Sequence, residues 1–160
     1  MEDLRVRVAT PADGEVIATV LTDSWGGTLM VGHSTVYDAL ELPALLAERD
    51  GEVVGLLTYA LGRDGLEVVT IDARVPRIGV GSALLAAAAK TARDAGAERV
   101  WLVTTNDNLD ALRFYQRRGM RIVDVSPGAV DAARSLKPSI PATGAYGIPL
   151  HDEITLELRL

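Results

Sequence analysis

Residues 73–85, Ala73-Arg74-Val75-Pro76-Arg77-Ile78-Gly79-Val80-Gly81-Ser82-Ala83-Leu84-Leu85, decide the fold. They join an apolar run at residues 66–71 to an Ala/Leu-rich stretch that ends near residue 95. Two glycines in the join let the backbone turn tightly and let a ligand approach its N–H groups. These groups begin a predicted helix, where the peptide dipoles favour a bound anion. The stretch therefore predicts a strand, a glycine turn and a helix that together bind phosphate.

The length and composition of the chain indicate one globular domain over residues 1–160. The chain is 48% hydrophobic and 24% charged, and no low-complexity segment interrupts it. Its net charge of −6 argues against nucleic acid or an acidic membrane as a partner. A cationic small molecule would suit this charge, although many acidic proteins use charge only for solubility.

The lack of cysteine and the small number of histidines exclude several kinds of metal site and catalytic mechanism. It has no cysteine, which excludes disulfides, thiolate metal sites and a cysteine nucleophile. The histidines, His33 and His151, are far apart in the sequence, so we expect no metal site. The N-terminus lacks a signal-peptide core, and no apolar run approaches the roughly 20 residues that span a bilayer. We expect a cytoplasmic protein that does not bind membranes.

Periodicity in the first half predicts a strand at residues 4–8 and a helix at residues 11–23. Residues 25–42 read as a short helix or a loop. Strands are expected at residues 44–47, 52–59 and 66–72. The turns between them are Arg49-Asp50-Gly51 and Arg63-Asp64-Gly65, both typical of hairpins.

The second half predicts a strand–helix–strand unit and a long connection. A buried helix at residues 82–95, ended by Gly96, leads to a strand at residues 100–103. A helix at residues 109–118, capped by Asn108, precedes a strand at residues 120–125. A connection at residues 127–152, with a short helix near residues 130–136, precedes a last strand at residues 154–160. The strands before and after the buried helix are expected to be parallel neighbours joined by a right-handed crossover. In all, we expect an α/β fold with a mixed sheet of six or seven strands and with three or four helices that cover both of its faces.

Two common phosphate-binding motifs do not fit the glycine turn. A dinucleotide-binding fold requires a third glycine where this chain has Leu84, and places the turn after its first strand. A P-loop requires a lysine between its last glycine and Ser or Thr, whereas Ser82 directly follows Gly81.

Two motifs resemble those of the Gcn5-related N-acetyltransferase (GNAT) superfamily. Gly79 and Gly81 match the small positions of its Gln/Arg-x-x-Gly-x-Gly/Ala motif, but Pro76 stands at the Gln/Arg position. A second signature, Asn-x-x-Ala-x-x-x-Tyr-x-x-x-Gly-Phe, is matched by Asn108, Ala111, Tyr115 and Gly119, with Met120 at the Phe position. The connection at residues 136–149 is similar to that of a little-characterised, bacterial-type branch of the superfamily.

The resemblance implies a mostly antiparallel sheet with a central parallel pair of strands that splay apart to admit acetyl-CoA. The pantetheine arm would pair with backbone at residues 71–75, and the pyrophosphate with N–H groups at residues 77–82. Because Pro76 lacks both an N–H group and a side-chain donor, Arg77 is our candidate for compensating charge, on either the pyrophosphate or the adenosine 3′-phosphate. The expected acetyl-CoA contacts are Ile71, Asp72, Ala73, Val75, Arg77, Ile78, Gly79, Val80, Gly81, Ser82, Asn106, Asn108 and Tyr115.

The resemblance also implies catalytic roles. Tyr115 would donate a proton to the departing thiolate, although a half-buried tyrosine on a helix can be purely structural. The general base would be a strand carboxylate, and Glu67 and Asp72 are the candidates. Five residues apart in a strand, they point to opposite faces unless a bulge intervenes. At most one is therefore expected to face the acceptor.

The acceptor side would be lined by Trp25, His33 and Tyr37, with His151 and Asp152 as weaker candidates and residues 127–152 as a lid. We expect an N-acetyltransferase that moves the acetyl group directly, in a ternary complex, to a primary amine of a small molecule. A CoA-binding regulatory or interaction module without transfer activity is the alternative. A homodimer is compatible with the resemblance.

Overall fold

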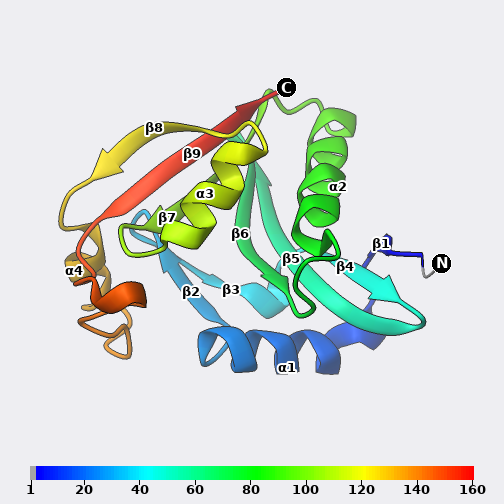
Figure 1. The fold of residues 1–160 in the computed structure, drawn as a ribbon, viewed down its shortest axis with the longest axis horizontal. Coiled ribbons are helices and arrows are strands. Elements are labelled where there is room, and N and C mark those ends of the chain that lie inside the picture. The colour runs from blue at the N-terminus through cyan, green and yellow to red at the C-terminus, as the bar shows by residue number, and fades with distance from the viewer. Residues whose placement is uncertain (1–2) are drawn as a thin grey trace. The chain divides into compact units, whose positions relative to one another are not determined.

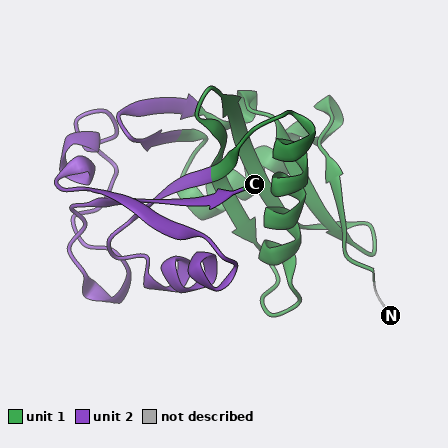
Figure 2. Ribbon diagram, turned by 90° about the horizontal axis from the view of Figure 1, so that it is seen from above, with its two compact units in different colours: residues 1–29, 38–100, 160 green, residues 30–37, 101–159 purple. Residues whose placement is uncertain are grey.

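The computed structural model describes residues 3–160, which form two compact units. The first unit comprises the residues up to 29, residues 38–100 and residue 160, and the second comprises residues 30–37 and 101–159 (Figure 2). Among residues 3–160, no helix is long and apolar enough to cross a membrane.

The first unit is an antiparallel sheet with helices on both faces (Figure 1). Strand β1 (Arg5–Val8) pairs with β4 (Ala44–Arg49), β4 with β5 (Glu52–Gly62), and β5 with β6 (Gly65–Ala73). Helix α1 (Gly14–Trp25) follows a short 3-10 turn (Pro11–Asp13), and a second 3-10 turn (Ala39–Glu41) precedes β4. Helix α2 (Val80–Asp94) follows the glycine turn and begins two residues before the predicted start at Ser82.

Close packing of α2 on the sheet depends on the absence of a side chain at Gly55. A Cβ atom there would lie 2.3 Å from Val80 Cγ1 and 2.9 Å from the carbonyl oxygen of Asp72. Val80, Leu84 and Leu57 are almost completely buried, so the start of α2 is part of the core. The first turn of α2 is thereby fixed next to the end of β6.

A β-bulge in β6 changes which side chains share a face. Thr58 pairs with Thr70, but Tyr59 pairs with Val68, so Val69 is an extra residue on β6. One extra residue reverses the alternation of side chains beyond it. The bulge lies between Glu67 and Asp72 and brings both carboxylates to the same face. The expectation that at most one of them faces the acceptor side is therefore not supported, and the physical reason is this bulge.

The second unit contains a two-stranded hairpin that the sequence analysis missed. Strands β2 (Leu29–Gly32) and β3 (Thr35–Asp38) lie within residues 25–42, which were expected to form a short helix or a loop. The turn residues His33 and Ser34 have positive φ angles of 40° and 64°. Two such residues form the turn that suits a tight hairpin, but Asn-Gly or Asp-Gly is the usual sequence signal.

The rest of the second unit follows the expected order. It comprises most of β7 (Arg99–Thr105), then α3 (Leu109–Arg117), β8 (Arg121–Ser126), α4 (Ala129–Ala133), a short 3-10 turn (Ala145–Gly147) and β9 (Glu153–Arg159). Strands β8 and β9 pair antiparallel.

The strand order of the seven-stranded sheet is β1-β4-β5-β6-β7-β9-β8. Strands β6 and β7 are the parallel pair, and the remaining pairs make the sheet mostly antiparallel. Helix α2 connects the parallel strands, as a crossover connection requires. The predicted fold class, a mixed α/β fold of six or seven strands and three or four helices, is confirmed: residues 3–160 contain a seven-stranded sheet and four α-helices.

Candidate active site

The glycine turn presents the N-terminus of α2 in a form that suits an anion. Gly79 is the N-cap in the left-handed region (φ 82°), and no atom would lie within 4 Å of a Cβ built there. The first helical hydrogen bond is donated by the N–H of Ala83 to the carbonyl oxygen of Gly79, at 2.9 Å. The preceding N–H groups, at residues 80–82, therefore point out of the helix end. No acidic side chain lies in this first turn.

The two arginines beside Pro76 have different surroundings. Arg74 donates to Asp23 at 3.1 Å, so its charge is already matched. Arg77 is exposed, has a positive φ of 67°, and forms no ion pair with any residue in the described range 3–160. The structure therefore distinguishes Arg77 as the unneutralised cation next to the start of α2.

Asp72, at the end of β6, forms a hydrogen bond with a predicted acceptor-side residue. The indole Nε1–H of Trp25 donates to Asp72 Oδ2 at 2.9 Å. Burial raises the pKa of Asp72 above its ordinary value, against the opposing effects of hydrogen bonds from Trp25 and Ser24 and of the charge of Arg74. A raised pKa moves a carboxylate toward the range in which a general base is effective.

Glu67 lies on the same face of β6 as Asp72, beyond the bulge. Its side chain is 6% exposed and Ala60 is its partner on β5. Between the two carboxylates, the Thr58 and Thr70 hydroxyls share a buried hydrogen bond of 2.7 Å. This face therefore carries two acidic groups separated by a fixed hydroxyl pair.

Helix α3 places the second motif. Asn108 occupies the N-cap position, but its side chain does not cap the helix and instead donates to Thr104 Oγ1 at 3.1 Å. The prediction that its side chain caps the helix is wrong, because the amide is held by the end of β7. Tyr115 is 7% exposed and packs edge-to-face on Phe114, with ring centroids 5.5 Å apart. Gly119 (φ 91°) lets the chain leave the helix.

Two of the three predicted acceptor-side residues meet in the second unit. The ring of His33 lies 6.3 Å from that of Tyr37 and 5.1 Å from that of Trp101, measured between centroids. The backbone N–H of His33 donates to Glu153 Oε1 at 3.1 Å. Trp25, the third predicted residue, belongs to the first unit. The sequence analysis missed Trp101 and Glu153 because they lie in strands, where Trp101 reads as core.

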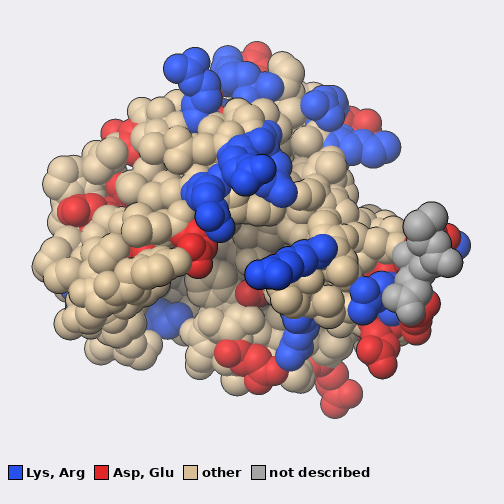
Figure 3. Space-filling view, viewed as in Figure 1, with Lys and Arg blue, Asp and Glu red and all other residues tan. Residues whose placement is uncertain are grey.

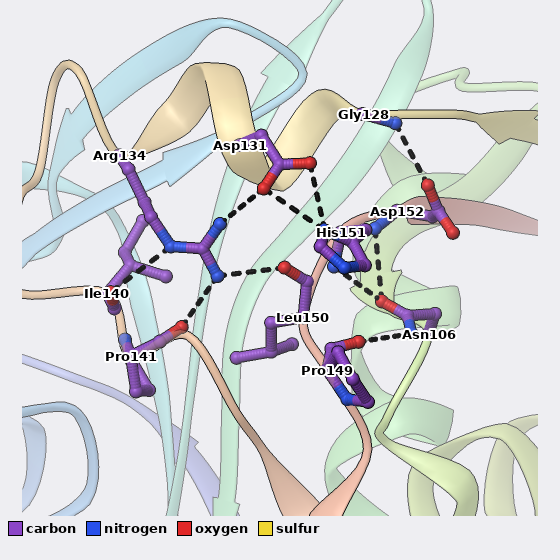
Figure 4. Close-up of polar contacts among 10 residues, drawn as sticks. All are labelled: Asn106, Gly128, Asp131, Arg134, Ile140, Pro141, Pro149, Leu150, His151 and Asp152. Atoms are coloured by element: carbon purple, nitrogen blue, oxygen red, sulfur yellow. Dashed lines mark hydrogen bonds and ion pairs between the residues drawn. The ribbon is translucent and has the colours of Figure 1, made fainter.

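The C-terminal end of the connection at residues 127–152 is held in place by the side chain of Asn106 (Figure 4). Asn106 Oδ1 accepts from the backbone N–H groups of His151 and Asp152, both at 3.0 Å, and Asn106 Nδ2 donates to Pro149 O at 2.9 Å. The Asn106 amide therefore positions residues 149–152. Whether it also contacts acetyl-CoA stays a prediction.

Arg134 organises the same connection from α4 (Figure 4). Its guanidinium donates to the carbonyl oxygens of Pro141 and Leu150, at 2.7 and 2.8 Å, and to Asp131 at 2.6 Å. Asp131 in turn contacts His151 Nδ1 at 3.0 Å. The predicted lid is therefore an ordered segment with a hydrogen-bonded interior.

Two acidic residues at the start of α3 also contact the connection, at residues 145 and 146. The Asp107 carboxylate accepts from the N–H of Ala145 at 2.8 Å, and the Tyr146 hydroxyl donates to Asp110 at 2.5 Å. Contact with Asp110 raises the pKa of Tyr146. A Cβ at Gly144 would lie 2.1 Å from Asp107 Oδ2, so this contact requires glycine.

Among residues 3–160, no group of three or more His, Cys, Asp or Glu side chains is arranged to hold a metal ion. Figure 3 shows that basic and acidic side chains are both distributed over the face in view. The net negative charge therefore does not form one continuous acidic surface on that face.

Comparison with known proteins identifies the family. Residues 15–120 match the acetyltransferase (GNAT) family. Two Bacillus subtilis proteins, named uncharacterized proteins YxbD and YdhI, are 36% and 37% identical over 147 residues, which cover 91% and 89% of this chain and 92% of each relative. An acetyltransferase from Bacillus subtilis, solved in complex with CoA, superposes with a TM-score of 0.72 over 99% of both chains at 19% identity. A GNAT acetyltransferase from Elizabethkingia anophelis, with acetyl-CoA bound, has a TM-score of 0.70 over 98% of both chains, also at 19% identity. The chain therefore belongs to the GNAT acetyltransferase family.

Proposed function

We propose that this protein transfers the acetyl group of acetyl-CoA to a primary amine of a small molecule. The observation that carries the proposal is the N-terminus of α2. It combines a left-handed glycine cap with open space, no acidic residue in the first turn, and an unneutralised Arg77. These features suit a pyrophosphate, because backbone N–H groups, the helix dipole and a free cation all favour an anion there.

Related proteins support acetyl-CoA as the co-substrate. Structures of the same fold carry CoA or acetyl-CoA, including a putative streptothricin acetyltransferase from Bacillus anthracis that is 16% identical. In this chain, the backbone at residues 71–75 would hold the pantetheine arm, and residues 77–82 the pyrophosphate. Acetyl-CoA supplies an activated acyl group as a thioester.

Direct transfer balances without a covalent enzyme intermediate. The amine nitrogen attacks the thioester carbonyl carbon, a C–N bond forms, and the C–S bond breaks. Tyr115 gives its hydroxyl proton to the departing thiolate, and a carboxylate accepts the proton that the amine loses. The absence of cysteine agrees with this route, because no thiol is present to carry the acetyl group.

Glu67 and Asp72 are the proposed proton acceptors, acting directly or through water. Both lie on the same face of β6 because of the bulge at Val69. Asp72 has the raised pKa that a base requires, and Trp25 orients its carboxylate. Glu67 is the more buried of the two. A base of either kind must act on an amine whose pKa is near 10 in water.

Thiol release from acetyl-CoA tests the proposal, measured against a panel of primary amines that includes amino acids, polyamines and arylalkylamines. We expect amine-dependent release in the unmodified protein and a loss of about 100-fold or more in kcat for Tyr115→Phe, with acetyl-CoA binding retained. Tyr146→Phe is the matched control, because its exposed hydroxyl contacts only Asp110 among the described residues.

Two results would contradict the proposal. Tight CoA binding with no turnover on any amine would favour the regulatory module. Equal turnover by Tyr115→Phe and the unmodified protein would show that Tyr115 is not the general acid.

A further inference from the structure

We propose that the second unit binds the ammonium group of an organic cation at Glu153, beside the rings of Trp101, His33 and Tyr37. The inference rests on the proposed function, which requires an amine, and adds that the protein recognises this amine in its protonated form. We call these four residues the Glu153 cluster.

Glu153 is a buried acid that forms no ion pair among the residues that the structure describes. Its side chain is 5% exposed at the start of β9. Oε1 accepts one hydrogen bond, from the backbone N–H of His33. Among residues 3–160, no Lys, Arg or His side chain forms an ion pair with this carboxylate. A carboxylate has about four acceptor positions, and removing it from water is costly unless a cation or several donors compensate.

The neighbouring aromatic rings are suited to a cation. The backbone N–H of His33 donates to Glu153. The centroid of the His33 ring lies 5.1 Å from that of Trp101 and 6.3 Å from that of Tyr37. The faces of Trp and Tyr rings attract ammonium groups, and Trp attracts them most strongly. His33 connects the two features, because its backbone N–H donates to Glu153 and its ring packs on Trp101. A buried carboxylate and aromatic rings on the same turn are the groups that an organic ammonium ion requires.

The β2–β3 hairpin gives this cluster its geometry. The left-handed turn at His33 and Ser34 directs the N–H of His33 toward Glu153, and Thr35 Oγ1 contacts His33 Nδ1 at 3.2 Å. A turn with two positive φ angles at residues other than glycine is strained. Its contacts with a buried acid and with an aromatic cluster indicate that the hairpin is held in one conformation.

The fluorescence of Trp101 provides a direct binding assay. The chain has two tryptophans, so in a Trp25→Phe background Trp101 is the remaining one. We would titrate this protein with 2-phenylethylammonium and, separately, with the neutral 2-phenylethanol. We expect a saturable change in Trp101 emission and an affinity for the ammonium at least about tenfold higher than for the alcohol, as a charge-assisted hydrogen bond gives. Equal affinities for the ammonium and the alcohol would overturn the inference, and this test requires no substitution of Glu153.

Glu153→Gln in the same background tests the residue itself. We expect at least about a tenfold loss of ammonium affinity and no change for the alcohol. Glu157→Gln is the matched control on the same strand, because Glu157 already pairs with Arg159 at 3.7 Å. Unchanged ammonium binding by a folded Glu153→Gln protein would overturn the proposal.

An acetyl-CoA titration and an amine turnover assay, both on the protein that retains Trp25, separate this inference from the proposed function. Acetyl-CoA binding and amine turnover without ammonium binding at Trp101 would overturn the inference alone. Ammonium binding without acetyl-CoA binding would overturn the proposed acetyl transfer and leave the cation site in place.

Discussion

Replacing Gly55 with alanine should displace the start of α2 and weaken acetyl-CoA binding. The added Cβ would lie 2.3 Å from Val80 Cγ1, 2.9 Å from the Asp72 carbonyl oxygen and 3.1 Å from Leu84 Cδ1. Contacts below 3.0 Å require movement, and one of these partners is backbone. Overpacking of a filled core costs about 1–3 kcal/mol. For a chain of this length, 1 kcal/mol corresponds to about 2–4 °C in Tm, so we expect a decrease of roughly 2–12 °C.

Gly62→Ala is the matched control for this substitution. Gly62 lies on the same strand, and no atom would be within 4 Å of its Cβ. Thermal unfolding followed by circular dichroism gives Tm for both variants, and calorimetric titration gives their affinity for acetyl-CoA. We expect Gly55→Ala to lose affinity as well as stability, since Val80 begins the helix that we propose holds the pyrophosphate. Equal Tm values for Gly55→Ala and Gly62→Ala would refute the packing argument.

Two acidic residues should change the pH dependence of stability in opposite directions. The Arg7 guanidinium holds the pKa of Asp13 well below its usual range through hydrogen bonds of 2.8 and 2.7 Å. This stabilisation is present above about pH 4 and is lost as the pH falls. Asp13→Asn should therefore lose less stability in acid than the unmodified protein. Equal shifts of the urea unfolding midpoint between pH 7 and pH 3 in the two proteins would contradict this. Burial raises the pKa of Asp72, so its contribution is full below about pH 4 and declines as the pH rises through the raised value. Asp72→Asn should therefore show a smaller decrease in stability between pH 4 and pH 7, and an unchanged decrease would show that the burial of Asp72 has no effect.

The sequence predicted the fold where local pattern and tertiary packing agree. The glycine turn at residue 79 precedes α2, and the motif at residues 108–119 spans α3 from its N-cap to the glycine that follows it. Backbone geometry restricts the residue type at both ends of such helices. Alternation along strands was less reliable, because the bulge at Val69 reverses it and has no signal of its own in the sequence. The hairpin at residues 29–38 was missed because its turn uses His33 and Ser34 in place of Asn-Gly or Asp-Gly.

Parts of the candidate site depend on contacts between distant residues and could not be predicted. Nothing local to Asp72 indicates that Trp25, 47 residues earlier, donates to it. The same holds for the amide of Asn106, which was expected to contact acetyl-CoA and is seen to hold residues 149–152. Glu153 reads as a charged residue at a strand end, and only the fold shows that it is buried.

Calorimetric titration of acetyl-CoA into Gly79→Ala and Gly128→Ala tests the central claim most directly. Both glycines are N-caps in the left-handed region, at φ 82° and 75°, and both have open space where a Cβ would lie. The two substitutions therefore impose similar backbone strain, but only Gly79 begins the helix proposed to hold the pyrophosphate. We predict one-to-one binding that is retained in Gly128→Ala and weakened at least about tenfold in Gly79→Ala, because a Cβ obstructs close approach to the N–H groups. Equal affinity in the two variants, or no binding by the unmodified protein, would contradict the account.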